Sequence, residues 1–232
     1  MYKRVLIKLS GESLMNEKEN INKEKVQELT NLFKQVRELG IELGIVIGGG
    51  NFFRGRSNQD MYQLYVDSMG MLGTCMNALG LMDGFKKNNV NAIFSTPFNL
   101  NNLYPTYTQE QLNNLIKDNV IVFGGGTGNI GCSTDTASSN KAKLINADVI
   151  IKLTNVDGVY DKDPNKYEDA KLYKSLTFKQ VLDNPEIKVM DIGAIEECKE
   201  NNIEIRVINF NDKNNLLELL KGKDIGTRIY ND

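Results

Sequence analysis

Residues 119–137 read NVIVFGGGTGNIGCSTDTA, and this stretch decides the fold that the sequence predicts. The apolar run 120–123 is typical of a strand buried on both faces, and five of the next eight residues are glycine. Glycine tolerates positive φ and lets backbone N–H groups approach an anion. Ser133 or Thr134 is suited to cap a helix that begins near Asp135, whose dipole would face the same anion. The stretch therefore predicts a strand, a phosphate-binding turn and a helix, the simpler alternative being a tight turn without a ligand.

A second glycine turn reads GGGN at residues 48–51, after the apolar run 45–47. Arg54 and Arg56 follow it directly, although the whole chain has only six arginines. The planar guanidinium group matches the oxygens of a phosphate. We interpret the two turns as sites for two phosphate groups, one on each side of a central sheet.

Composition restricts the classes of function. The 232 residues carry a net charge of -2, so no basic excess indicates nucleic acid or an anionic membrane. The three cysteines are widely spaced, which argues against a disulfide framework or a zinc site and favours a reducing cytoplasm. There is no histidine, which excludes Ser-His-Asp and Cys-His catalysis and histidine-ligated metals. We expect neither a leader peptide nor a membrane-spanning segment.

Hydrophobic periodicity predicts strands that alternate with helices along the whole chain. The expected strands are residues 2–9, 41–47, 91–95, 120–123, 147–153, 203–208 and 225–229. The expected helices are residues 24–39, 59–87, 110–117, 136–146, 177–183, 193–201 and 212–220, with a turn or hairpin at 154–164. This order predicts a three-layer α/β/α sandwich with a mostly parallel central sheet. Because no linker divides the sequence, we expect residues 1–232 to form one domain with two functional lobes.

The helix expected at 59–87 has apolar residues on two sides and contains five of the eight methionines. Burial on both sides favours packing on the sheet and on a second subunit, the alternative being an internal helix of a monomer. Asp67 is an acid within this helix, so it either faces solvent or has a partner. Lys8, beside the turn that follows the first strand, is either a lysine that reaches solvent or a phosphate ligand.

Other nucleotide-binding classes fit less well. Residues 126–131 match the dinucleotide fingerprint G-x-G-x-x-G, which favours an NAD-linked oxidoreductase. In a dinucleotide-binding fold, the acid that binds the ribose should lie at the end of the next strand, whereas Asp148 lies at the beginning of that strand. There is no G-x-x-x-x-G-K-[ST] motif, and the protein-kinase H-R-D motif needs a histidine. The class of function that remains is phosphoryl transfer without a Walker motif, in which positioning and positive charge provide most of the catalysis.

Six motifs in order along the chain resemble the bacterial UMP kinases (uridylate kinases) of the amino acid kinase superfamily. They are LIKLSGES near the start, GIVIGGGNFFRG at 44–55, DSMGM at 67–71, GGGTGN with STDT at 124–136, NVDGVYDKDP at 155–164 and VMDIGA at 189–194. The resemblance implies a cytoplasmic, homohexameric enzyme of pyrimidine biosynthesis that transfers the γ-phosphoryl group of ATP to UMP with Mg²⁺. A carbamate or amino-acid kinase, an NAD-linked oxidoreductase and a non-catalytic nucleotide sensor stay as alternatives.

The resemblance also implies roles for individual residues. The residues implied for catalysis are Lys8, Arg54, Asp135, Lys152 and Asp191. Those implied for ATP, whose lobe is expected to be roughly C-terminal, are Lys8, Leu9, Ser10, Gly11, Gly50, Arg54, Thr154, Asn155, Tyr160 and Asp163. Those implied for UMP, in an N-terminal lobe, are Gly49, Asp67, Thr127, Gly128, Asn129, Ile130, Gly131, Cys132, Ser133 and Thr134.

The chain departs from the family pattern in three places. Ser68 stands where the family commonly has histidine, and residues 130–132 read IGC where it has proline and aromatics. Many members are activated by GTP and inhibited by UTP, and in those the segment after the first strand is glycine-rich. Here residues 15–22 contain two acids and no glycine, so we expect weak or absent GTP activation, while UTP could still inhibit at the UMP site.

Overall fold

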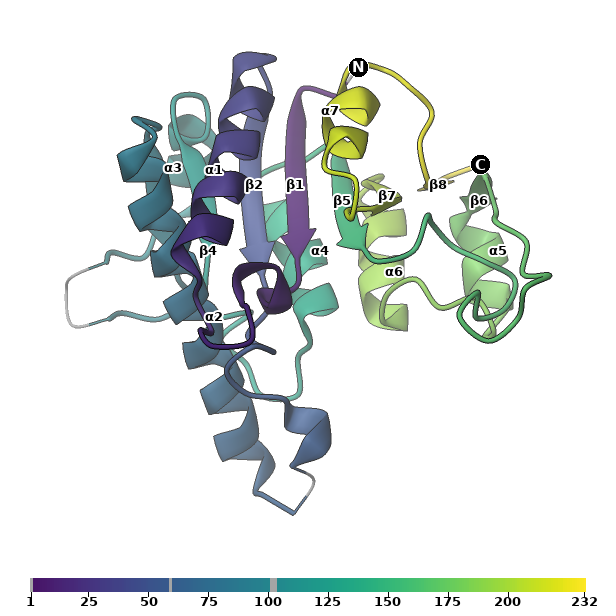
Figure 1. Ribbon diagram of the computed structural model, residues 1–232, viewed down its shortest axis with the longest axis horizontal. Coiled ribbons are helices and arrows are strands. Elements are labelled where there is room, and N and C mark those ends of the chain that lie inside the picture. The colour runs from purple at the N-terminus through teal and green to yellow at the C-terminus, as the bar shows by residue number, and fades with distance from the viewer. Residues whose placement is uncertain (1, 59, 101–103) are drawn as a thin grey trace.

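The computed structural model describes residues 2–58, 60–100 and 104–232, and of Arg56 the backbone only. These residues form an eight-stranded sheet in the order β3-β4-β2-β1-β5-β7-β8-β6 (Figure 1). The strands are β1 (Arg4–Leu9), β2 (Glu42–Ile47), β3 (Ala92–Ser95), β4 (Val120–Phe123), β5 (Val149–Thr154), β6 (Ser175–Thr177), β7 (Glu204–Asn209) and β8 (Thr227–Tyr230). The pairing of β7 with β8 is antiparallel and the other pairings are parallel. The prediction of a mostly parallel sheet is therefore confirmed.

Helices cover both faces of the sheet and complete three layers. One face packs against α1 (Lys23–Glu38), α2 (Gln63–Lys87) and α7 (Asn214–Leu220). The other packs against α3 (Gln109–Leu115), α4 (Thr134–Leu144), α5 (Phe178–Asp183) and α6 (Ile192–Glu200). Short 3₁₀ helices, η1 (Gly11–Leu14) and η2 (Gly55–Ser57), follow the ends of β1 and β2.

The buried strands explain this arrangement. All six residues of β2 and all four of β4 are buried, as expected for parallel strands with helices on both faces. Helix α1 has Asn22 as its N-cap residue, and it ends before Gly40, which has a φ of 81°. The core consequently consists of two apolar layers, one on each side of the sheet.

Three details differ from the sequence predictions. Strand β6 was not predicted, because three residues are too few to show an alternating pattern. The long helix begins at Gln63, and residue 59, its expected start, lies outside the described residues, as do residues 101–103 of the loop before α3. A turn or hairpin was expected at 154–164: residues 155–158 form bends, and instead of a hairpin within this segment Tyr160 forms an isolated bridge with Leu172.

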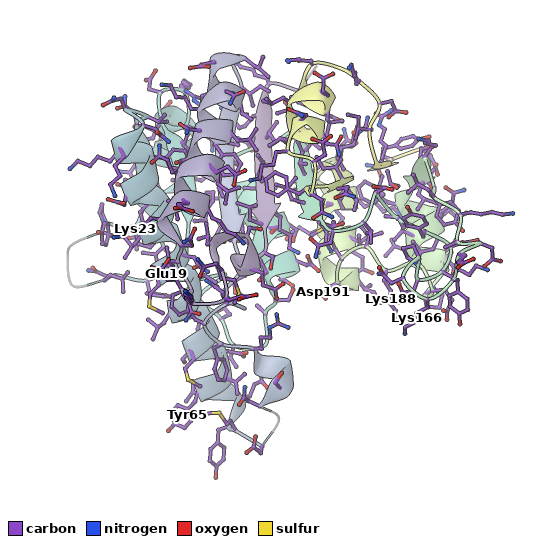
Figure 2. The ribbon with its side chains drawn as sticks, viewed as in Figure 1. Glu19, Lys23, Tyr65, Lys166, Lys188 and Asp191 are labelled. Atoms are coloured by element: carbon purple, nitrogen blue, oxygen red, sulfur yellow. The ribbon has the colours of Figure 1, made fainter. Side chains whose placement is uncertain are left out.

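Helix α2 is apolar on two sides, and the chain covers one of them. Cys75, Ala78, Leu81 and Phe85 are buried against the sheet. The side chains exposed along the other side and just before the helix are Met61, Tyr62, Leu64, Tyr65, Leu72 and Met76. Figure 2 shows Tyr65 at the end of α2 that projects beyond the rest of the molecule. The exposed side supports the expectation of a subunit interface, which stays a prediction.

Across the described residues, no helix is both long and apolar enough to cross a bilayer. The three cysteines are free, with Cys75 and Cys198 buried and Cys132 exposed.

Candidate active site

Two lysines and an acid predicted for catalysis meet at the carboxyl ends of the central strands. Lys8 of β1 pairs in register with Lys152 of β5. Asp135 stands in the first turn of α4, and its Oδ1 lies 2.6 Å from Lys8 Nζ and 3.7 Å from Lys152 Nζ. Parallel neighbouring strands end at one edge of the sheet, so residues 144 positions apart in the sequence become neighbours.

The surroundings of Lys152 favour the binding of an anion next to its ammonium group. Its side chain is 22% exposed, and Nζ donates a hydrogen bond to the carbonyl oxygen of Val189. Burial and the nearby charge of Lys8 lower the pKa of Lys152 from 10.5 to about 8, while Asp135 acts in the opposite direction. A phosphate group placed here would restore the stability of the ammonium form.

The N-terminus of α4 brings the second predicted acid to the same place. Ser133 is the N-cap residue, as predicted, and its Oγ accepts hydrogen bonds from the N–H groups of Asp135 and Thr136 at 3.0 and 3.2 Å. The same hydroxyl donates to Asp191, which precedes α6. Two carboxylates, Asp135 and Asp191, and two lysines, Lys8 and Lys152, therefore lie close to the start of α4.

The glycine turn before α4 has the backbone that the sequence predicts. Gly125, Gly126, Gly128 and Gly131 have φ values of 76°, 57°, 82° and 79°. In the other turn the reason for glycine is space, because a Cβ on Gly49 would lie 2.6 Å from the carbonyl oxygen of α2 residue Gly70.

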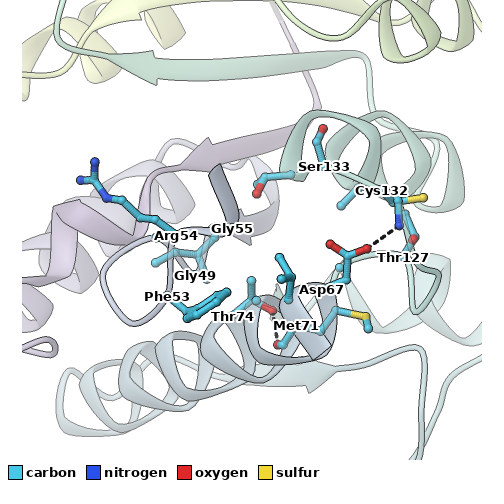
Figure 3. A pocket seen from close by; sticks show the side chains of 18 of the residues that line it. Gly49, Phe53, Arg54, Gly55, Asp67, Met71, Thr74, Thr127, Cys132 and Ser133 are labelled. Carbon is cyan, nitrogen blue, oxygen red and sulfur yellow. Dashed lines mark hydrogen bonds between the residues drawn. The ribbon is translucent and has the colours of Figure 1, made fainter. Parts of the chain in front are cut away.

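Both glycine turns border one cavity of about 780 Å³ (Figure 3). The two turns border a single cavity because β2 and β4 are adjacent strands that end at one edge of the sheet, and two phosphate sites, one on each side of the sheet, stay a prediction. The residues predicted for UMP that line this first cavity are Gly49, Asp67, Thr127, Asn129, Gly131, Cys132, Ser133 and Thr134. Gly128 and Ile130 are not among its lining residues: Gly128 lies against Pro97 and the Ile130 side chain is exposed. Gly50 and Arg54, predicted for ATP, line this cavity as well.

Asp67 bridges α2 and the glycine turn. Its Oδ2 accepts a hydrogen bond from the N–H of Gly131 at 2.6 Å, and its Oδ1 accepts one from Gln63 Nε2 at 2.8 Å. Figure 3 shows this contact across the cavity from Phe53. The acid therefore has partners, and its carboxylate occupies one anion-binding position of the turn.

Arg54 is not joined to the lysine cluster in this structure. Its guanidinium forms an ion pair with Glu12, and Figure 3 shows it directed away from Asp67 and Cys132. The side chain of Arg56 lies outside the described residues. Glu12 was not predicted as a site residue, although it follows Ser10 and Gly11 directly in the sequence.

A second cavity of about 360 Å³ lies next to the first, and Glu12 lines both cavities. Of the residues predicted for ATP, Ser10, Thr154 and Asn155 line it. Residues that sequence reasoning missed there are Ser13, Lys25, Glu28, Leu29, Leu153, Phe210, Asn211 and Lys213. Phe210 and Asn211 follow β7 directly, so the rule that parallel strands end together could have found them.

The other residues predicted for ATP do not line the second cavity. Leu9 is buried, and its carbonyl oxygen accepts from the N–H of Gly48 at 3.0 Å. Gly11 is closely packed, because a Cβ there would lie 2.5 Å from the carbonyl oxygen of Gly48. Tyr160 donates to Asp157 at 3.4 Å, and Asp163 accepts from the N–H of Asn165 at 3.0 Å.

The geometry argues against the dinucleotide alternative. Asp148 accepts from the N–H groups of Lys3 and Arg4 at 2.7 and 2.8 Å, at the amino end of β1, whereas the glycine turn follows the carboxyl end of β4.

Within the described part of the chain, no group of three or more acids or cysteines is arranged to hold a metal ion.

Two comparisons agree on the relatives of this chain. The model of the amino acid kinase family matches residues 3–209. The solved structure of UMP kinase from Bacillus anthracis is 32% identical with a TM-score of 0.94, over 100% of this chain and 97% of that one. UMP kinase from Ureaplasma parvum is 31% identical with a TM-score of 0.91, over 99% of both chains. Uridylate kinase from Archaeoglobus fulgidus is 25% identical with a TM-score of 0.72, over 97% of this chain and 99% of that one.

Proposed function

The chain belongs to the amino acid kinase family, and on that premise we propose that it is a UMP kinase, which transfers the γ-phosphoryl group of ATP to UMP and gives UDP and ADP. The observation that carries the proposal is the contact between Lys8, Lys152 and Asp135, beside two cavities that share Glu12. Two adjoining cavities suit a donor and an acceptor. Lys8, Lys152 and Asp135 line neither cavity themselves, but Asp135 follows Thr134 of the first cavity and Lys152 precedes Leu153 of the second, so the cationic cluster lies beside both.

In the proposed reaction, UMP occupies the first cavity and ATP the second. An oxygen of the UMP phosphate forms a bond to the γ-phosphorus while the bond from that phosphorus to the β,γ-bridging oxygen breaks. The attacking oxygen is already ionised at neutral pH, so no general base is needed. Lys8 and Lys152 stabilise the charge on the transferred group, and Asp135 orients both ammonium groups.

Mg²⁺ is proposed to enter with ATP, and the residues present fit an ion held mainly by phosphates. Mg²⁺ at such sites keeps several waters and takes one or two carboxylates in addition to the phosphate oxygens. Asp135 and Asp191 are the two carboxylates at the start of α4. Bound there, the ion would neutralise negative charge on the phosphates.

Two further proposals concern assembly and inhibition. The exposed apolar side of α2 supports a homo-oligomer, for which we propose a hexamer by analogy with the family. UTP is proposed to inhibit by competing with UMP for the first cavity.

An assay of ADP release tests the function. The protein is supplied with ATP, Mg²⁺ and, in turn, UMP, CMP, dTMP, carbamate and glutamate. The proposal expects turnover with UMP well above that with the other acceptors. Turnover with carbamate or glutamate would instead identify another kinase of the family, and binding of UMP without turnover would identify a nucleotide sensor.

A further inference from the structure

Lys141 is a buried cation in the wall of the first cavity. Helix α4 turns Thr134, Ala137 and Lys141 toward this cavity, a spacing of three and then four residues that places them on one helical face. Lys141 is 7% exposed, and it forms no ion pair within the described chain. Lys143 of the same helix is an ordinary surface lysine, about half exposed and 3.7 Å from Glu197.

An ammonium group in this position is costly unless something compensates it. Burial lowers the pKa of Lys141. The Nζ of Lys141 lies 5.9 Å from the centroid of the Phe123 ring, which is a cation–π contact. This contact offsets only part of the hydration that the ammonium group loses on burial. Buried lysines are rare without an acid partner. Lys141 therefore has the character of a group that is complementary to a ligand in the cavity.

The position along α4 indicates which part of a ligand Lys141 would meet. Thr134 stands at the start of the helix, beside the cluster of Lys8 and Asp135 where the phosphate must react. Lys141 is seven residues further on, about 10 Å along the helix axis. That length is comparable with the extent of a nucleoside monophosphate from its phosphate to the outer edge of its base.

We propose that Lys141 donates a hydrogen bond directly to the carbonyl oxygen at C4 of the uracil base of the acceptor nucleotide. The inference rests on the proposed function and adds a specificity-determining residue to it. An ammonium group donates and never accepts. Uracil presents a carbonyl oxygen at the position where cytosine presents an amino group, so Lys141 favours uracil over cytosine.

The test compares kcat/KM for UMP and for CMP in Lys141→Met, Lys141→Arg and the matched control Lys143→Met. Lys141→Met should lower kcat/KM for UMP by about 10- to 100-fold, the range for loss of a hydrogen bond from a charged donor. It should leave the value for CMP unchanged or higher, so the preference for UMP falls. Lys141→Arg should recover part of the preference, because the guanidinium keeps the donors, and Lys143→Met should change neither value.

Thermal unfolding of each variant shows that it is folded, and calorimetric titration with UMP and with CMP gives the same comparison without turnover. An equal loss for both nucleotides, or an unchanged preference in Lys141→Met, would overturn the inference while leaving the proposed function intact. If the parent protein does not phosphorylate UMP, the proposed function fails, and the titrations still decide whether Lys141 distinguishes the two bases.

Discussion

Replacing Lys152 with methionine should make the folded protein more stable at neutral pH and less active. The pKa of Lys152 is about 8 in the folded protein and 10.5 as the ordinary value for lysine. At pH 7 the side chain is nevertheless protonated in both states, so the folded state bears the cost of a buried ammonium beside Lys8. Methionine fills a similar volume without a charge, and Asp135 keeps its contact with Lys8 at 2.6 Å.

The magnitude follows from the two pKa values. Protonated Lys152 lowers the free energy of unfolding by about 3 kcal/mol at pH 7, and the hydrogen bond to Val189 returns about 1 kcal/mol of stability. The variant should therefore gain about 2 kcal/mol, which is a rise in Tm of about 4–8 °C for a chain of this size. Because the pKa of Lys152 is lowered in the folded state, the parent becomes more stable as pH increases from about 8 to 10.5. At pH 10 the cost of burying Lys152 falls to about 1 kcal/mol, so the variant should no longer be more stable than the parent.

Urea unfolding of the parent and the variant at pH 7 and at pH 10 measures the difference. Lys179→Met, at an exposed position of α5, serves as the control and should change stability little at either pH. A variant less stable than the parent at pH 7, or a gain that persists at pH 10, would refute this account of Lys152.

Four further outcomes are expected. In the parent, kcat/KM for ATP should fall as pH rises through about 8, because Lys152 loses its charge. The corresponding fall in kcat should occur at a higher pH, because bound phosphates raise the pKa of Lys152 again. A flat pH–rate profile from 7 to 9.5 would contradict this. Lys8→Ala and Arg54→Ala should each lower kcat by about 10² or more with folded-state spectra unchanged, and near-normal kcat would remove the residue from the mechanism. Sedimentation at micromolar concentration should detect an oligomer, and Tyr65→Glu on α2 should weaken it, whereas a monomeric parent would leave the exposed side of α2 without a cover. Millimolar GTP should change the initial rate little at subsaturating ATP, and a several-fold rise would mean that residues 15–22 are not where the effector acts.

The parts of the site that the sequence predicted are those with a local signal. The strand 120–123 and a helix cap at Ser133 or Thr134 were predicted from neighbouring residues, and the structure has the strand and places the cap at Ser133. Lys152 was implied only by the resemblance, and its pairing with Lys8 was not predicted, although parallel strands end at the same edge of a sheet. The resemblance, in turn, supplied residues such as Tyr160 and Asp163 that the structure leaves outside the second cavity.

What the sequence could not predict depends on contacts between distant segments. Nothing near Lys141 in the sequence distinguishes it from Lys143, yet one is buried in a cavity wall and the other pairs with an acid at the surface. Similarly, Gly49 was read as a phosphate ligand from the glycine cluster, whereas the approach of Gly70 also demands a residue without a side chain. The exposure of a lysine and the neighbours of a glycine are set by the packing of α4 and α2, which no local pattern contains.

The two sets of cations differ in how firmly the protein holds them. Lys8 and Lys152 lie on paired strands, are largely buried and share Asp135, so they are oriented before a ligand arrives. Arg54 follows a glycine turn, and its ion pair with Glu12 joins two half-exposed side chains. Such a surface pair contributes about 0–1 kcal/mol, little enough for a phosphate in either cavity to replace Glu12 as the partner of Arg54. In the proposed reaction, the Arg54 guanidinium would then be able to follow the charge of the phosphoryl group between the two cavities that Glu12 lines, while Lys8 and Lys152 hold their positions.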